Sequence, residues 1–208
     1  MAYRDFTLTD LKEQFGLRLD ERSDLFAGIA PVEVSPLLQE ILRRNLPLAL
    51  AISTEKARSE MIIAPVLLEV WGQMEGQVSL FSGTDFTVDA ARGLNGVCDF
   101  LLSLSPEQLT IEAPVAVVAE AKNENMRQGI AQCIAAMVAA QLFNRQRKNA
   151  IETVHGAVTT GNIWKFLRLT EAVVQVDVAE YYIKDVERIV GILLSILRGA
   201  QQSQPHAA

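Results

Sequence analysis

Three charged residues interrupt two apolar segments that are otherwise typical of buried β-strands. Asp99 lies within GVCDFLLSL (96–104), and Glu120 and Lys122 end the run PVAVVAEAKN (114–123). Because side chains alternate along a strand, Glu120 and Lys122 point to the same face. If the two segments pair, Asp99 reaches that face as well. The sequence therefore predicts that these three side chains lie together.

Two carboxylates and one ammonium group would suit metal-dependent hydrolysis of a phosphodiester. Carboxylate oxygens are the ligands that Mg²⁺ or Mn²⁺ prefers, and a bound cation activates water and neutralises charge that develops on a phosphate. A neighbouring lysine can position the water or stabilise the anionic transition state. A Glu-x-Lys pair at a strand end is also common as a solvated ion pair worth about 0–1 kcal/mol. The apolar run before Glu120 favours a site, because unpaired charges on a central strand are costly.

The elements that must position these residues can be read from periodicity. Residues 54–71, TEKARSEMIIAPVLLEVW, carry apolar side chains at helical spacing, and Pro65 should kink this helix. Residues 124–144 are rich in Ala and contain no proline, which predicts a long helix. Further helices are predicted over 35–45, with Ser35 as the N-cap, and over 181–199. Further strands are predicted over 78–83, 154–160, 163–169 and 172–178.

This order of helix, strands, helix, strands and helix predicts an α/β fold in which helices cover a mixed central sheet. We expect three parts along the chain. Residues 1–53 form an N-terminal helical and extended extension, residues 54–198 form the core, and residues 199–208 form a flexible tail.

Asp99 followed by Glu120-Ala121-Lys122, between a leading and a following helix, resembles the PD-(D/E)xK nuclease superfamily. SEMIIAPVLLEVWG resembles the first core helix of restriction-enzyme N-terminal nuclease domains, and HGAVTTGNIWKFLRL resembles their hairpin after the second core helix. Val97-Cys98 replaces the proline that names the motif. The resemblance covers roughly residues 54–198 and implies a three-layer restriction endonuclease-like core.

The resemblance also implies roles for individual residues. Asp99 and Glu120 would be catalytic metal ligands for Mg²⁺ or Mn²⁺, and Lys122 would activate or orient the attacking water. Glu60 in the leading helix would be a further metal ligand, and Glu55 is the competing choice for that position.

Other polar residues have two interpretations. Gln128 and Gln132 lie one turn apart on the second core helix, where they either approach the site or pack their amides against the sheet. Ser103 and Asn123 are candidates for supporting hydrogen bonds. His155 is interpreted as a hydrogen-bonded histidine at a strand end rather than as a ligand.

The composition limits the partners. The chain has 208 residues and a net charge of -6, which argues against strong unaided binding to nucleic acid. The basic run RQRK (145–148) either contacts phosphates or complements the dipole of the preceding helix.

Cys98 and Cys133 fit no metal-binding pattern and are expected to be reduced and buried. The start of the chain has no apolar leader and no stretch is apolar enough to span a membrane, so we expect a cytoplasmic protein.

The predicted function is that of a Mg²⁺-dependent nuclease that hydrolyses phosphodiester bonds in DNA. A homodimer would fit cleavage of both strands, which needs two sites. The alternative is a catalytically silent nucleic-acid-binding or structural module with the same fold. An α/β enzyme of another kind is disfavoured, because the phosphate-loop, dinucleotide and nucleophile-elbow motifs are missing from the sequence.

Overall fold

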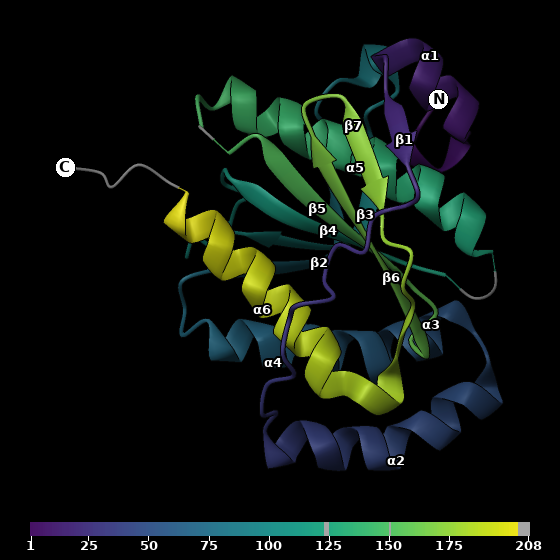
Figure 1. Ribbon diagram of the computed structural model, residues 1–208, viewed down its shortest axis with the longest axis vertical. Helices are drawn as coiled ribbons and strands as arrows, with labels where there is room; N and C mark the ends of the chain where they lie inside the picture. Colours follow the sequence, from purple (N-terminus) through teal and green to yellow (C-terminus); the bar gives the residue numbers. More distant parts are fainter. Residues whose placement is uncertain (123–124, 150, 204–208) are drawn as a thin grey trace.

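A mixed β-sheet of eight strands forms the centre of the computed structural model, which describes residues 1–122, 125–149 and 151–203 (Figure 1). The strand order is β1-β7-β6-β5-β4-β3-β2, and β8 pairs with β6. The strands are β1 (Arg18–Asp20), β2 (Ser79–Asp85), β3 (Val97–Ser103), β4 (Val115–Ala121), β5 (Thr153–Thr159), β6 (Ile163–Thr170), β7 (Val173–Val176) and β8 (Tyr181–Tyr182). The pairs β1–β7 and β4–β5 are parallel, and the other pairs are antiparallel. The predicted α/β fold with a mixed sheet is confirmed.

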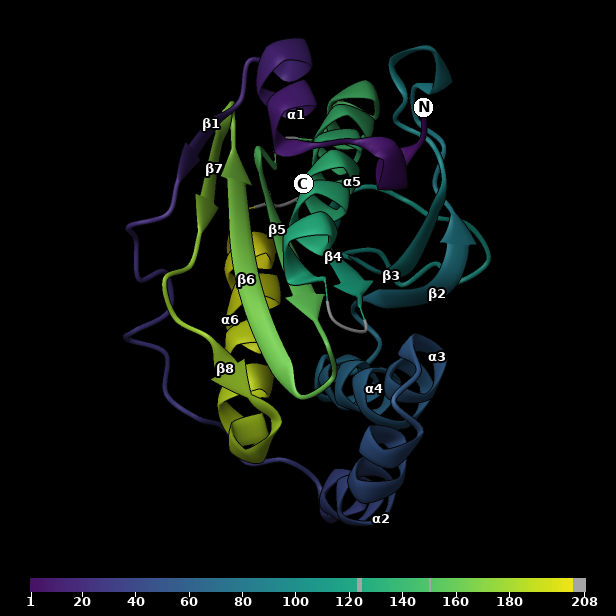
Figure 2. The same ribbon diagram turned by 90° about the vertical axis from the view of Figure 1, so that its right-hand side faces the viewer.

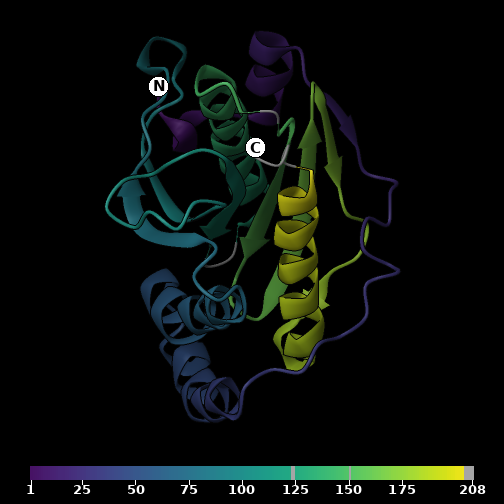
Figure 3. The same cartoon turned by 90° about the vertical axis from the view of Figure 1, so that its left-hand side faces the viewer.

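Helices cover both faces of the sheet, as Figures 2 and 3 show. On one face α5 and α1 pack over a cluster of apolar side chains, and on the other face α4 and α6 cover a second cluster, with α2 packed on α4. The α-helices are α1 (Leu8–Phe15), α2 (Pro36–Ile52), α3 (Glu55–Arg58), α4 (Ala64–Gln73), α5 (Met126–Gln146) and α6 (Val186–Gln202). Short 3₁₀ turns cover Tyr3–Asp5, Ala90–Arg92 and Ile183–Asp185. In the described part of the chain, no helix has the length and apolar character needed to cross a membrane.

The helix predicted over 54–71 is interrupted, as its proline led us to expect. A π-helical turn, Ser59–Ile63, joins α3 to α4, and the N–H of Ala64 donates to Ser59 O across this wide turn. The reason is Pro65, which has no N–H and whose ring crowds the preceding turn. Asn45 Nδ2 donates to Met61 O at 3.4 Å, so it supplies a partner for a carbonyl that Pro65 cannot bind.

Both ends of the chain are more integrated than predicted. Within residues 1–53, β1 is an edge strand beside β7, and Tyr3 and Phe6 are buried in the cluster beneath α5. These residues therefore belong to the folded core rather than to an extension. At the other end α6 continues to Gln202, where Ala200 packs on the core, so residues 199–202 are helical rather than a flexible tail. Residues 204–208 of the predicted tail lie outside the described residues.

Candidate functional site

The candidate site lies where the pairing of β3 with β4 ends. The last paired residues at this end are Phe100 and Ala119. At the next position of β3, Oδ2 of Asp99 accepts a hydrogen bond from the N–H of Ala121 at 2.8 Å. If the pairing of β3 with β4 continued, a backbone carbonyl of β3 would accept this hydrogen bond instead. The end of the ladder thus directs the Asp99 carboxylate onto the final residues of β4.

Glu120 and Lys122 form a close ion pair at the same place. Lys122 Nζ lies 2.6 Å from Glu120 Oε1. The Glu120 residue is 2% exposed and the Lys122 side chain 15% exposed, so water screens the pair poorly. The three charged residues singled out in the sequence therefore meet at one end of the central strand β4. The ribbon in Figure 2 shows that this end of β4 lies near the start of α5.

The three groups do not balance in charge. Burial raises the pKa of Glu120 from its ordinary value of 4.5 to about 8; the Asp99 carboxylate raises it further, and Lys122 opposes this rise. Burial alone would lower the pKa of Lys122, but the charges of Glu120, Glu55 and Asp99 outweigh burial and raise it. Two carboxylates thus share one ammonium group in a poorly hydrated place. A bound cation would relieve the remaining repulsion.

A pocket of about 250 Å³ opens beside Asp99. Its charged lining consists of three carboxylates and one lysine, from Asp99, Glu55, Glu60 and Lys56. The face next to the three-residue site is therefore acidic rather than basic. It favours a cation over a bare phosphate, so any phosphate would need a counter-ion in order to bind.

The structure separates the two candidate glutamates of the leading helix. Glu60 lines the pocket, but its side chain is 60% exposed and lies 2.8 Å from Lys56 Nζ in an ion pair along the helix. Glu55 stands at the start of α3, close enough to raise the pKa of Lys122. The competing choice, Glu55, is therefore the one coupled electrostatically to the three-residue site. Glu60 sits within the π-helical turn, which alters the angular spacing of side chains along this segment.

Asp99 and Glu120 fit a hard divalent cation. Within the described ranges, no three His, Cys, Asp or Glu side chains are grouped as a complete metal site. Mg²⁺ is usually held by one or two carboxylates, with waters and substrate phosphate as its remaining ligands. The two buried or half-buried carboxylates supply that donor type. Burial and, after it, the charge of Asp99 raise the pKa of Glu120, and a bound cation would offset both effects.

The other predicted residues lie around the site in different ways. Gln128 is exposed near the start of α5 and lines a pocket formed with residues 4–9, rather than the pocket beside Asp99. Gln132 is half-buried one turn further along α5. Ser103 is at the opposite end of β3, where its hydroxyl donates to Pro114 O at 3.2 Å. Asn123 lies outside the described residues.

The basic run at 145–148 does not border the site. It lies at the C-terminal end of α5, a helix of 21 residues. Such a helix is about 30 Å long. Lys122 precedes the first residue of α5, Met126, so it lies at the end opposite the basic run. Figure 1 shows the course of α5 along the sheet. Arg147 Nη1 lies 3.9 Å from Glu112 Oε2 and its guanidinium lies over the Phe143 ring. The run therefore gives no local support to phosphate binding at Asp99.

Gly129 is a packing position on which the placement of Lys122 depends. A Cβ placed on Gly129 would lie 2.7 Å from Lys122 Cγ and 2.7 Å from Val158 Cγ1. The missing side chain lets α5 approach β4 and β5 and pack on the aliphatic part of Lys122. The only signal in the sequence is a glycine inside a helical segment, where it is unfavourable unless packing requires it.

We expect Gly129→Ala to lower the free energy of unfolding by about 1–3 kcal/mol, because the added methyl group overpacks the contact between α5 and the sheet. Gly199→Ala on α6 is the matched control, since its Cβ would meet nothing within 4 Å. It should raise stability by about 0.5–1 kcal/mol through helix propensity. Urea denaturation followed by circular dichroism measures both. An unchanged or higher stability of Gly129→Ala would contradict the close packing.

The chain was also compared with known proteins. No model of a known protein family matches it, and no curated protein is significantly similar to it. Its function must therefore be argued from the site itself.

Proposed function

We propose that this protein is a divalent-cation-dependent nuclease with a restriction endonuclease-like core of the PD-(D/E)xK type, which hydrolyses phosphodiester bonds in DNA. One observation carries the proposal. A carboxylate that is 2% exposed, Glu120, lies beside Asp99 and 2.6 Å from the ammonium group of Lys122, at the end of a central strand. Burying such a group is costly. Carboxylates whose pKa is strongly perturbed in this way cluster at functional sites.

Each residue has a defined task in this proposal. Asp99 and Glu120 would hold Mg²⁺ or Mn²⁺, which supplies Lewis-acid polarisation of the phosphate when it is bound. Lys122, held in place by Glu120 and by the packing of α5, donates a hydrogen bond that orients the attacking water. Its positive charge also stabilises the negative charge that develops on the phosphate. Glu120, and to a lesser extent Glu55, raise the pKa of Lys122 and so help to keep it protonated.

The size of the pocket beside Asp99 supports a polymeric phosphodiester as substrate, and a bound cation would have to offset its acidic lining. Its volume of about 250 Å³ lies below the ~300–1,000 Å³ that is usual for sites enclosing a whole small molecule. It can accept one phosphate group of a longer chain. Its acidic lining means that phosphate binding depends on the cation, so we expect little affinity for DNA in the presence of a chelator.

A silent module with the same fold is the second candidate, and one feature favours it. The ion pair between Lys122 and Glu120 is already closed, and one oxygen of Asp99 is occupied by the N–H of Ala121. If these contacts are purely structural, the protein would bind neither cations nor scissile phosphates at this place.

Cleavage of DNA should require Mg²⁺ or Mn²⁺. We expect the purified protein to nick supercoiled plasmid or single-stranded oligonucleotides when either cation is present, to stop in EDTA and to recover with excess cation. Calorimetric titration of Mg²⁺ should show binding that Asp99→Asn removes and that Asp24→Asn, an exposed control, retains. Absence of both cation binding and DNA cleavage in the wild type would select the silent module. Cation binding without cleavage would refute the proposed catalytic role of the site.

A further inference from the structure

A larger pocket, of about 630 Å³, lies on the face of the sheet that α6 covers, at the last turns of this helix. Its floor is a row of three polar side chains on adjacent strands, because the register aligns His155 with Arg168 and Arg168 with Gln175. Neighbouring strands are about 4.8 Å apart, so the row spans roughly 10 Å. We call this the β5–β7 pocket. It shares no lining residue with the pocket beside Asp99.

The walls of the β5–β7 pocket are mainly apolar. Leu25, Phe26 and Ile29 come from the segment between β1 and α2, and Ile196 and Ala200 come from the last turns of α6. The Phe26 ring lies against His155, with 6.4 Å between ring centroids. A ligand here would therefore place an apolar body against these walls and a polar group against the floor.

Two groups on the floor are incompletely satisfied. His155 Nδ1 is buried and has no hydrogen-bond partner among residues 1–122, 125–149 and 151–203, so the expectation of a hydrogen-bonded histidine is wrong. Burial and the nearby Arg168 lower the pKa of His155 to about 4, so its ring is neutral at pH 7. Unpaired buried polar atoms are costly, so a ligand that donates to or accepts from this nitrogen would be favoured.

Arg168 brings an uncompensated positive charge. Its Nε and Nη2 donate to Gln175 Oε1 at 2.9 and 2.7 Å, which holds the guanidinium over the floor. No carboxylate in the described part of the chain lies within ion-pair distance of it, although the exposed Glu152 also lines the pocket. A planar guanidinium without a counter-ion is suited to a carboxylate.

We propose that the β5–β7 pocket binds a small monocarboxylate with an aliphatic body. Arg168 would pair with the carboxylate, the neutral His155 would contribute a hydrogen bond, and the apolar body would pack between Phe26 and Ile196. Among the described residues that line the pocket there is one arginine and no second cation, which favours a monoanion over a phosphate ester. Its volume lies within the ~300–1,000 Å³ range of small-molecule sites. This inference is independent of the proposed nuclease function.

Calorimetric titration with octanoate and its neutral analogue octanamide tests this proposal. We expect the wild type to bind octanoate at least about tenfold more tightly than octanamide, since hydrogen bonds to charged groups contribute about 1.5–3 kcal/mol. Arg168→Gln should abolish this preference. Ala200→Trp should block both ligands by filling the pocket from α6, and circular dichroism confirms folding of each variant.

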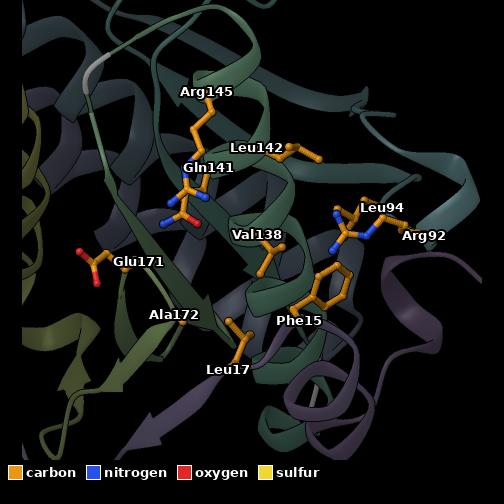
Figure 4. Close-up of a pocket in the computed structure, with 10 residues that line it drawn as sticks. All are labelled: Phe15, Leu17, Arg92, Leu94, Val138, Gln141, Leu142, Arg145, Glu171 and Ala172. Carbon is orange, nitrogen blue, oxygen red and sulfur yellow. The ribbon is translucent and has the colours of Figure 1, made fainter.

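The matched control is Arg145→Gln, which changes an arginine in a separate pocket of about 320 Å³ beside α5 (Figure 4) and should bind octanoate as the wild type does. Equal affinity of the wild type for both ligands, or no binding of either, would overturn the proposal. So would octanoate binding that survives in folded Ala200→Trp.

Discussion

Replacing Lys122 by methionine is expected to reduce cation-dependent DNA cleavage by about 10²–10⁴-fold, which is the usual contribution of a positioned proton-transfer or water-orienting group. Methionine keeps an unbranched apolar stem, so it preserves the contact of α5 at Gly129, where Lys122 Cγ packs. The loss should appear in kcat. Single-turnover nicking of plasmid in excess protein measures it directly.

The same substitution, Lys122→Met, should not weaken the binding of Mg²⁺, although it reduces cleavage. Lys122 Nζ occupies a Glu120 oxygen at 2.6 Å in the wild type, so its removal frees that oxygen and removes a competing positive charge. We therefore expect Lys122→Met to bind Mg²⁺ as tightly as the wild type or more tightly. Lys184→Met, at an exposed position in the turn before α6, is the control and should leave cleavage unchanged. Full cleavage by Lys122→Met would remove Lys122 from the mechanism.

The second large effect is a pH dependence of stability that Glu120 causes. The pKa of Glu120 is about 8 in the folded protein and near 4.5 when the chain unfolds. Between these values the folded state keeps a proton that the unfolded state releases, so stability falls as pH rises. The stabilising contribution is complete below about pH 4.5 and is lost through about pH 8. In this window we expect the wild type to lose about 1.4 kcal/mol per pH unit relative to Glu120→Gln.

Chemical denaturation from pH 5 to pH 9, in a chelator that keeps the site free of cations, measures this difference. Glu13→Gln, at an exposed position of α1, is the control and should follow the wild-type profile. Comparing each variant with the wild type cancels the titration of all other groups. Parallel profiles for the wild type and Glu120→Gln would show that Glu120 is ionised in the folded protein, and the charge imbalance we infer would then be absent.

The elements that carry the candidate site could be predicted from the sequence, because each has a short-range physical signal. The continuous apolar run before Glu120 predicts a central strand, and β4 is buried along its whole length. Pro65 predicts an interruption in the leading helix, and the π-helical turn is found there. The positions of Asp99, Glu120 and Lys122 within their segments also indicated that they would meet, since strand periodicity orients side chains locally.

Only the tertiary structure decided how these elements combine, because the deciding contacts join residues far apart in the chain. Because the pairing of β3 with β4 ends next to Asp99, its carboxylate accepts the hydrogen bond from the N–H of Ala121. Of the two glutamates in the leading helix, Glu55 influences the pKa of Lys122, whereas Glu60 pairs with Lys56. Because α5 is 21 residues long, the basic run at its C-terminal end is separated from the site by the whole helix. Packing of the first turn against α5 buries Tyr3 and Phe6, pairing of β1 with β7 adds an edge strand, and the register of β5 and β6 aligns His155 with Arg168. Periodicity orients a side chain within its own segment, whereas strand pairing and helix packing determine which distant side chain it meets.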